Sequence, residues 1–232
     1  MSDRVPTIVS IQVGLPAEHG VADATDPHDR RWISAFYKQP VTGPVWAGKT
    51  NLAGDGQADL EHHGGVDKAV LAYSADHYEY WNQHLGRGEL PPGAFGENLT
   101  IAGLQESTVC IGDVWQAGEV RFEVSQPRQP CWKLSRRWRV DDLAAQVVRN
   151  GRSGWYLRVL AEGNLSAGTE LELVARPSPN WTVARASELM HHRKDDLSAA
   201  AELAALPALS ASWRTTLEQR VARRPATKQA PF

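Results

Sequence analysis

The residue with the clearest capacity for chemistry is a cysteine in a basic stretch of the chain. Cys131 follows two prolines and is flanked by four cationic side chains: Arg128, Lys133, Arg136 and Arg137. Neighbouring positive charge favours the thiolate, the form of cysteine that binds metals and attacks electrophiles. We therefore take Cys131 as the candidate reactive residue. An inert structural thiol is the alternative that this pattern leaves open.

The second cysteine stands in different surroundings. Cys110 lies among apolar, strand-forming residues, and we expect it to pack as a small hydrophobic side chain. Two cysteines cannot supply the four thiolates of an iron–sulfur cluster or of an all-cysteine zinc site. Any such cluster must come from a separate protein. With 232 residues, 42% of them hydrophobic, the chain can bury a core without disulfides.

A second candidate site is the segment 54–69, which is rich in glycine and histidine. Gly64 and Gly65 allow backbone N–H groups to turn inward as an anion-binding nest. The imidazoles of His62 and His63 and the ammonium of Lys68 would favour a phosphate or another anion there. A glycine-rich barrel turn whose histidines bond the backbone is the open alternative. Zinc is disfavoured, because adjacent histidines point apart on a strand and neither HExxH nor CxxC occurs.

A third candidate site is the segment Gly93–Thr100. Two glycines bracket Phe95 and allow the backbone to pass close to a ligand, while Glu97 and Asn98 present polar groups. A loop in which the asparagine bonds its own backbone explains the same pattern.

The elements that must position these segments are mostly strands. Alternating runs near Ile11 and Val13, over 120–124 and over 170–173 predict half-buried strands, and Ala117-Gly118 predicts a hairpin turn. Two helices interrupt them. One runs from a Ser74 cap to Gly86, with three residues on one face (Tyr78, Trp81 and Leu85), and the other spans 141–151. Many short strands with few helices predict a closed or nearly closed β-barrel.

The composition changes near residue 178, where we place a domain boundary. Beyond Trp181 glycine disappears, alanine and leucine dominate, and an acidic excess becomes a basic one. We therefore predict a barrel domain over 1–178 and a small three-helix bundle with a frayed tail over 179–232. The caps are Thr182, Asp195 or Asp196, and Ser210, and the last helix has an apolar stripe of Trp213, Leu217 and Val221. We expect Arg214, Arg220, Arg223 and Arg224 to form a solvated face, with a docking surface as the alternative.

The overall composition excludes several classes of protein. A formal net charge of -2 argues against binding to duplex nucleic acid, which favours a strong basic excess. No apolar run of the signal-peptide or membrane-spanning kind is present, so we expect a cytoplasmic protein without membrane segments.

Taken together, the three candidate segments resemble the MOSC domain, a β-barrel domain named after the C-terminal part of molybdenum cofactor sulfurases. The matching stretches are NLAGDGQADLEHHGGVDKAV over 51–70, FGENL over 95–99 and SQPRQPCWKL over 125–134. The closest likeness is to bacterial YiiM-type proteins, whose barrel is also followed by a three-helix domain. The resemblance therefore covers nearly the whole chain.

The resemblance implies a site for the molybdenum cofactor, a pterin dithiolene that carries the metal and a phosphate tail. Cys131 would then be the protein ligand of molybdenum, which suits a soft thiolate. Histidines 62 and 63 would shape the pocket, and either could relay a proton. The implied cofactor-binding residues are Gly64, Gly65, Asp67, Lys68, Glu97, Asn98, Arg128 and Lys133. The resemblance also implies two properties associated with the family, pyridoxal phosphate binding and a role in detoxification.

The implied reaction is the reduction of N-hydroxylated purine bases and related N-oxygenated compounds, with uptake of two electrons and two protons and loss of water. Trp132, next to the ligand, could stack on a flat base or simply be a core tryptophan beside the barrel mouth. The electrons would come from a separate flavoprotein or iron–sulfur protein. Two other functions stay open: a non-redox carrier of the cofactor or of sulfur on Cys131, and a binding module that uses the helical bundle.

Overall fold

A computed structural model describes residues 5–223, except for the side chain of His62. Its main feature is an eight-stranded sheet in the order β12-β8-β9-β10-β6-β7-β1-β4. All neighbouring strands in it are antiparallel except β6 and β7, which are parallel. The strands are β1 (Thr7–Val13), β4 (Gln39–Pro40), β6 (Val70–Ser74), β7 (Leu99–Ala102), β8 (Val114–Ala117), β9 (Val120–Pro127), β10 (Trp155–Ala161) and β12 (Glu172–Ala175).

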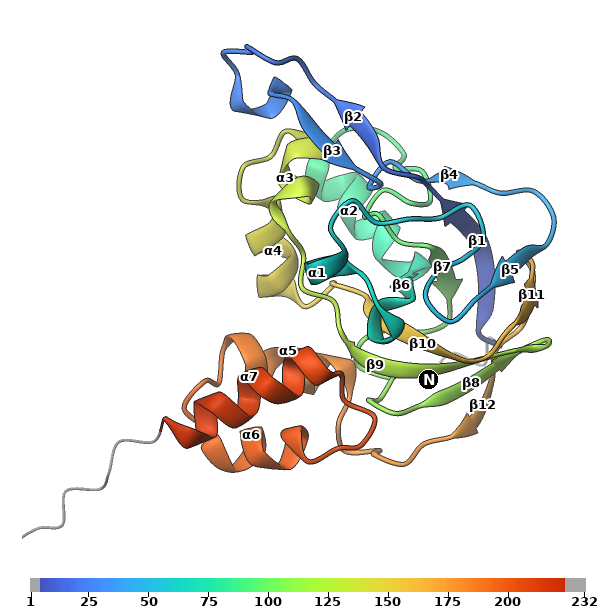
Figure 1. Cartoon of the computed structure of the whole chain (residues 1–232), viewed down its shortest axis with the longest axis vertical. Coiled ribbons are helices and arrows are strands. Elements are labelled where there is room, and N and C mark those ends of the chain that lie inside the picture. Colours follow the sequence, from blue (N-terminus) through green and yellow to red (C-terminus); the bar gives the residue numbers. More distant parts are fainter. Residues whose placement is uncertain (1–4, 224–232) are drawn as a thin grey trace, which may run out of the picture.

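The sheet curls until its two ends approach each other (Figure 1). An antiparallel bridge joins Thr7 in β1 to Glu170, just before β12, and the amide of Leu171 donates to the carbonyl of Pro6 at 2.8 Å. These bonds explain why β12 begins two residues later than the start of the predicted strand over 170–173. The predicted mainly β, nearly closed barrel is confirmed.

Two smaller pairs of strands extend this barrel. One joins β5 (Val45–Ala47) to β11 (Gly163–Leu165), and the other is the hairpin of β2 (Ala17–His19) and β3 (Trp32–Ser34). The β2–β3 hairpin encloses the short turn η1 (Pro27–Asp29) and projects at the opposite end of the molecule from the C-terminal helices (Figure 1).

Short helices pack against one side of the sheet. They are α1 (Leu60–His63), η2 (Val66–Lys68), η3 (Ala75–His77), α2 (Tyr78–Leu85), α3 (Trp132–Trp138) and α4 (Leu143–Asn150). The predicted cap at Ser74 is confirmed, since its side chain accepts from the amide of Asp76, and Gly86 and Gly151 end α2 and α4 with positive φ. The hairpin turn lies one residue later than predicted, because Ala117 still pairs with Val120. The helix α3 was not predicted.

The C-terminal bundle consists of α5 (Val183–His191), α6 (Leu197–Ala204) and α7 (Ala211–Ala222). Thr182, Asp196 and Ser210 accept hydrogen bonds from amides in the first turns of these helices, which confirms the predicted caps. None of the helices within 5–223 is long and apolar enough to cross a membrane.

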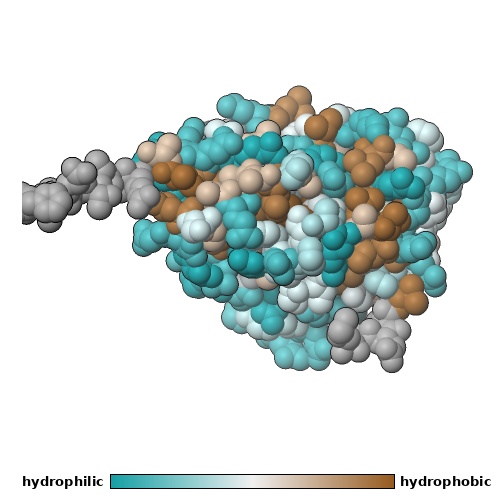
Figure 2. All heavy atoms as spheres, turned by 90° about the horizontal axis from the view of Figure 1, so that it is seen from below, coloured by the Kyte–Doolittle hydropathy of each residue, from teal (hydrophilic) through white to brown (hydrophobic). Residues whose placement is uncertain are grey.

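The bundle and the barrel share one hydrophobic core. Buried side chains of the bundle, among them Val183, Leu203 and Trp213, belong to the same cluster as Phe122 and Val124 of β9. In β9 the apolar residues alternate with Arg121 and Glu123, as the sequence pattern predicts. Seen from below, barrel and bundle form one unbroken surface (Figure 2). The predicted boundary at residue 178 falls between β12 and α5, but the core crosses it.

Two arginines of the bundle do not form the solvated face that we expected. Arg214 donates to the carbonyls of Leu206 and Pro207, and Arg220 donates to those of Leu189 and Met190. Arg220 therefore serves carbonyls in the last turn of α5, and Arg214 serves those of the turn between α6 and α7. Arg224 lies outside the described residues.

Candidate functional site

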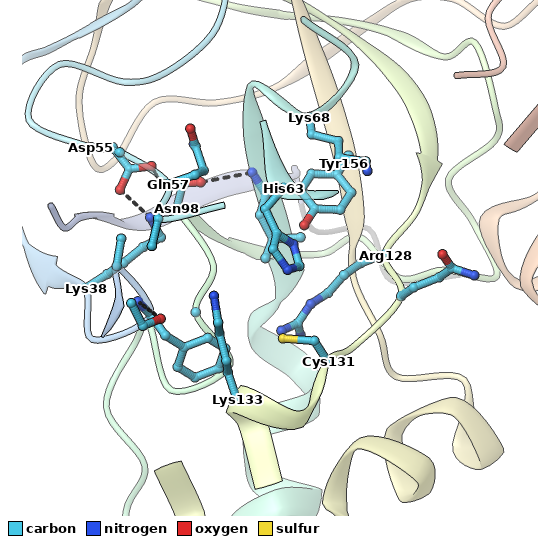
Figure 3. Close-up of a pocket in the computed structure, with 18 residues that line it drawn as sticks. Lys38, Asp55, Gln57, His63, Lys68, Asn98, Arg128, Cys131, Lys133 and Tyr156 are labelled. Carbon is cyan, nitrogen blue, oxygen red and sulfur yellow. Dashed lines mark hydrogen bonds and ion pairs between the residues drawn. The ribbon is translucent and has the colours of Figure 1, made fainter. Parts of the chain in front are cut away.

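The three candidate segments meet at one open pocket (Figure 3). Six of the predicted site residues line it: His63, Lys68, Asn98, Arg128, Cys131 and Lys133. Other lining residues belong to the same three segments: Asp55, Gly56, Gln57, Ala58, Gly96 and Gln129. The rest of the wall comes from parts of the chain that the sequence did not single out for chemistry: Ser34, Ala35, Phe36, Lys38, Leu71 and Tyr156.

Cys131 lies where the extended loop after β9 turns into α3. It is the N-cap residue of that helix and has extended backbone angles, so its side chain is free to point away from the helix. The thiol is half-buried, forms no disulfide and faces the pocket beside Arg128 (Figure 3). Cys110, by contrast, is 1% exposed and its thiol lies 3.5 Å from the carbonyl oxygen of Pro179. Burial, together with nearby Asp113, raises the pKa of the Cys110 thiol, which confirms the prediction that it packs.

Arg128 is the most unusual polar group of the pocket. Its backbone amide is fixed by a 3.0 Å bond to the carbonyl of Gly154, and the residue is only 4% exposed. Its Nη1 is buried, and no described group forms a hydrogen bond with it. Because an unpaired buried charge is costly, a cationic group left this way inside a pocket indicates an anionic ligand.

The pKa of His63 is lowered by its burial and by the positive charges around it. Burial, and then Lys133, Lys68 and Arg128, lower the pKa of His63 from 6.5 to about 4, against the opposing effect of Asp59. The imidazole is therefore neutral at neutral pH, and its role as a proton relay stays a prediction. A bound anion would offset the cations and raise this pKa again.

Another wall of the same pocket is internally paired. The ammonium of Lys38 forms an ion pair with Asp55 Oδ1, which also accepts from the amide of Gly14 at 2.9 Å. The other carboxylate oxygen, Asp55 Oδ2, accepts from Asn98 Nδ2 at 2.9 Å. Asn98 Oδ1 accepts from the amide of Leu71 at 3.0 Å. Every polar end of Asn98 is thus used in tying loops together, so its role here is to position the wall.

Glu97 lies behind the pocket and is fully buried. Its Oε1 accepts from the amide of Gly93 at 2.8 Å and its Oε2 from the amide of Phe95 at 3.1 Å, while the hydroxyl of Tyr78 also donates to Oε1. The carboxylate therefore holds the loop that leads into it. Gly96 has φ 79°, and a Cβ there would come within 2.7 Å of the Phe36 ring, so the glycine serves loop packing.

The predicted anion nest is placed differently. Gly64, Gly65 and Asp67 are outside the lining residues. A Cβ on Gly64 would lie only 3.0 Å from the carbonyl oxygen of Leu60, so this glycine packs closely on Leu60. Gly65 is the residue before η2 and has φ 91°. The two glycines precede η2, the turn that carries Lys68. The side chain of His62 lies outside the described residues.

The donor set fits a metal that brings most of its own ligands. Among the described residues, no three His, Cys, Asp or Glu side chains gather as a metal-binding group. The pocket offers one thiol, Cys131, surrounded by Arg128, Lys68 and Lys133. A soft ligand beside an anion-binding wall matches a pterin dithiolene with a phosphate tail.

An aromatic group borders this site. Trp132 is 54% exposed and lies 5.3 Å from the ring of Trp32, and the guanidinium of Arg136 lies over both rings. Trp132 is therefore a rim residue, and the interpretation of it as a core tryptophan is wrong.

Comparison with known proteins agrees with this geometry. Residues 59–172 match the MOSC domain, and residues 181–224 match the YiiM-like, 3-alpha helix domain. An uncharacterized protein of Bacillus subtilis, YflK, is 41% identical over 90% of this chain and 92% of its own length. The chain belongs to the MOSC family. Its bundle corresponds to the YiiM-like helical domain of that family.

Two other curated MOSC relatives are informative. Protein YiiM of Escherichia coli is 39% identical over 81% of this chain and 84% of its own length. A protein of Gibberella moniliformis named reductase is 40% identical over 75% of this chain, which spans only 31% of that longer protein. Neither the matched domains nor these names mention pyridoxal phosphate or detoxification, and both stay predictions.

Solved structures support the same assignment. The crystal structure of YiiM from Geobacillus stearothermophilus has a TM-score of 0.77 at 38% identity and covers 93% of this chain and 99% of that one. The crystal structure of YiiM from Escherichia coli has a TM-score of 0.72 at 35% identity and covers 80% of this chain and 89% of that one. The MOSC barrel and the helical domain are thus known together as a fold.

Proposed function

We propose that this MOSC protein binds the molybdenum cofactor through the Cys131 thiolate and reduces N-hydroxylated compounds, including N-hydroxylated purine bases. Membership of the MOSC family and a relative named reductase support an enzyme of this general class. The cofactor, the substrates and the metal ligand are the parts that we propose.

The observation that carries the proposal is the pairing of Cys131 with Arg128. The thiol faces the pocket beside a guanidinium that is 4% exposed and has a buried, unpartnered Nη1. A thiolate ligand and a donor for an anion therefore lie together, which an inert structural cysteine would not require.

Three cationic residues supply the binding energy for the anionic parts of the cofactor. Arg128 can donate through Nη1, while Lys68 and Lys133 contribute charge from two other segments of the pocket wall. A hydrogen bond to a charged group contributes about 1.5–3 kcal/mol. The paired wall around Asp55 keeps its shape without help from the ligand.

When bound, the cofactor supplies a metal centre able to take oxygen from an N–O bond. The residues of the chain orient the substrate and handle protons. Trp132, which is 54% exposed and packs on the buried Trp32, presents an aromatic face next to Cys131 on which a flat base can stack. His63 can take up a proton once bound anions offset the neighbouring cations. Overall, the N–O bond breaks, two electrons and two protons enter, and the products are the amine or imine and water.

The electrons come from a separate flavoprotein or iron–sulfur protein in this proposal. With two cysteines, of which Cys110 is buried in the core, the chain has no set of thiolates for a cluster of its own. The exposed rim at Trp132, next to Cys131, is the side from which a donor can approach.

The test is to purify the wild type from a molybdate-replete host and measure its molybdenum and releasable pterin. Reduction of an N-hydroxylated purine is then assayed with a flavoprotein reductase as electron donor. We expect about one molybdenum per chain at full loading, and a loss of activity of at least a hundredfold in Cys131→Ala, since a metal ligand is removed.

The matched control is Cys110→Ala, which removes the other thiol from the core and leaves the pocket intact. It should keep the molybdenum content and the activity. A wild type without molybdenum, or a Cys131→Ala variant with full activity, would overturn the proposal. Intact pterin content with loss only of persulfide labelling in Cys131→Ala would instead favour the carrier function.

A further inference from the structure

The start of α7 contacts both segments that supply the cations of the pocket. Asp67, next to Lys68, accepts from the amide of Ala211 at 2.9 Å through Oδ2. The amide of Ser210 donates to the carbonyl of Ser125 at 3.0 Å, in the strand that leads to Arg128. One turn of the helical bundle therefore touches η2 and β9 at the same time.

Arg158 completes this connection from β10. Its Nε donates to Asp67 Oδ1 at 2.6 Å, and its Nη1 donates to Glu123 Oε2 and to the carbonyl of Ala208, both at 2.6 Å. Although partial burial opposes it, the bonds from Arg158 and Ala211 lower the pKa of Asp67, so the carboxylate is ionised at neutral pH. Charge-assisted bonds of this kind are short and strong.

Asp67 is the point at which η2 is bonded to its neighbours. η2 is a single turn of three residues, none of them buried, that starts after Gly65 with φ 91°. The hydroxyl of Ser125 in β9 donates to the carbonyl of Asp67 at 2.6 Å. Asp67, the residue next to Lys68, is therefore bonded to β9, β10 and α7.

We propose that the C-terminal three-helix domain sets the anion-binding geometry of the pocket, with Asp67 and the Ala211 amide as positioning groups. They hold Lys68 at the correct distance from Arg128, and neither group touches the ligand. This inference rests on the proposed function only for the identity of the anion, since it concerns the pocket itself.

The chain offers a selective way to test this. Ala211 is the exposed first residue of α7, where proline is well accepted, and Ser210 has φ -56° and ψ 149°, which suits a residue before proline. Ala211→Pro therefore removes the N–H that Asp67 accepts and keeps the helix. Ala211→Ser is the matched control, because it retains the N–H.

The probe is inorganic phosphate, whose dissociation constant is measured by NMR titration of the full chain. We expect Ala211→Pro to weaken phosphate binding about threefold or more and to speed hydrogen exchange of the Lys68 amide, which is bonded to the Gly65 carbonyl at 3.0 Å. Exchange in β6 should be unchanged. Ala211→Ser should match the wild type in both measurements.

A double-mutant cycle with Asp67→Ala completes the test. If both groups act through one bond, the double variant binds phosphate no more weakly than Asp67→Ala alone. Equal phosphate affinity in Ala211→Pro and Ala211→Ser would overturn the inference, as would a wild type that binds no phosphate. A wild type that binds phosphate normally but lacks molybdenum would contradict the proposed function and leave this inference standing.

Discussion

Arg128 and Lys38 are buried to a similar degree in the same pocket, with 4% and 9% of their surfaces exposed, but their hydrogen-bond and ion-pair partners differ. Lys38 has Asp55 as an ion-pair partner, which in turn binds Asn98. Arg128 has a buried Nη1 without a described partner. The paired wall, defined by Lys38, Asp55 and Asn98, is complete without a ligand. The cationic wall, defined by Arg128, Lys68, Cys131 and Lys133, includes the buried Nη1 of Arg128, a donor that a ligand can use.

The two walls contain similar residue types, so what distinguishes a structural wall from a binding wall is whether its buried charges are already compensated. Both walls are polar and both line the cavity. Removing one partner from a buried pair leaves a buried charge uncompensated, whereas removing an already uncompensated charge relieves the fold. Substitutions in the two walls should therefore have opposite effects on stability and on binding.

The largest expected effect is in the paired wall. Asp55→Asn leaves Lys38 buried without its counter-charge and should lower the free energy of unfolding by about 3–5 kcal/mol in urea denaturation. Asp142→Asn is the control, since that carboxylate is 56% exposed in its pair with Arg149, and its loss should leave the free energy of unfolding nearly unchanged. Equal costs for the two variants would remove the distinction between the walls.

The next effect is in the cationic wall. Arg128→Met keeps the length of the side chain but removes its charge, so the free energy of unfolding should stay the same or rise by about 1 kcal/mol. Phosphate binding, followed by NMR titration, should weaken about tenfold or more, because a charged hydrogen bond is lost. A marked loss of stability in this variant would show that Arg128 belongs to the scaffold.

A smaller effect concerns the pH dependence of His63. Its pKa is about 4 in the folded chain and 6.5 when unperturbed, so between these pH values the unfolded chain binds a proton that the folded one does not. The stability that depends on neutral His63 is full above pH 6.5 and is lost as the pH falls towards 4. His63→Asn should flatten this part of the stability curve, measured by denaturation at several pH values.

Phosphate should also raise the pKa of His63 by about one unit, as followed by NMR, because the anion offsets the cations around it. His191 is an internal control, since its pKa is also lowered by burial and by neighbouring cations but it lies in α5, away from the pocket. A parallel shift of both histidines would indicate a general salt effect.

The smallest expected effect is that of Lys133→Met. This lysine is half-buried at the pocket wall, so screening by water should limit the loss of phosphate affinity to about twofold or threefold. The same titration measures it beside Arg128→Met. A loss of phosphate affinity as large as that of Arg128→Met would show that Lys133 binds the anion as strongly as the buried Arg128.

Much of the fold could be predicted because local signals carry it. Ser74, Thr182, Asp196 and Ser210 each cap the element that the sequence pattern placed after them. Cys110 lies among apolar neighbours in the chain and in the structure alike. In these cases the deciding contacts are a few residues apart, so a short window contains them.

The helix α3 and the paired wall could not be found in this way. α3 has seven residues, and long-range bonds fix it: Arg137 donates to the carbonyl of Gly93 at 2.7 Å, and the indole of Trp138 donates to that of Ala94 at 2.9 Å. Likewise, Lys38 meets Asp55 only after β1, β4 and β7 assemble. The glycine-rich segment did contain Asp55, but nothing near it in the sequence indicated a cation as its partner.

The hydrophobic core that crosses residue 178 has a consequence for how this protein can be divided. A unit of sequence that matches a domain need not be a unit of folding, and here Val183, Leu203 and Trp213 complete the packing of β9. We infer that barrel and bundle unfold in one cooperative transition and that neither is portable to another chain by itself. The bundle is therefore better regarded as the last layer of the barrel than as an attachment to it.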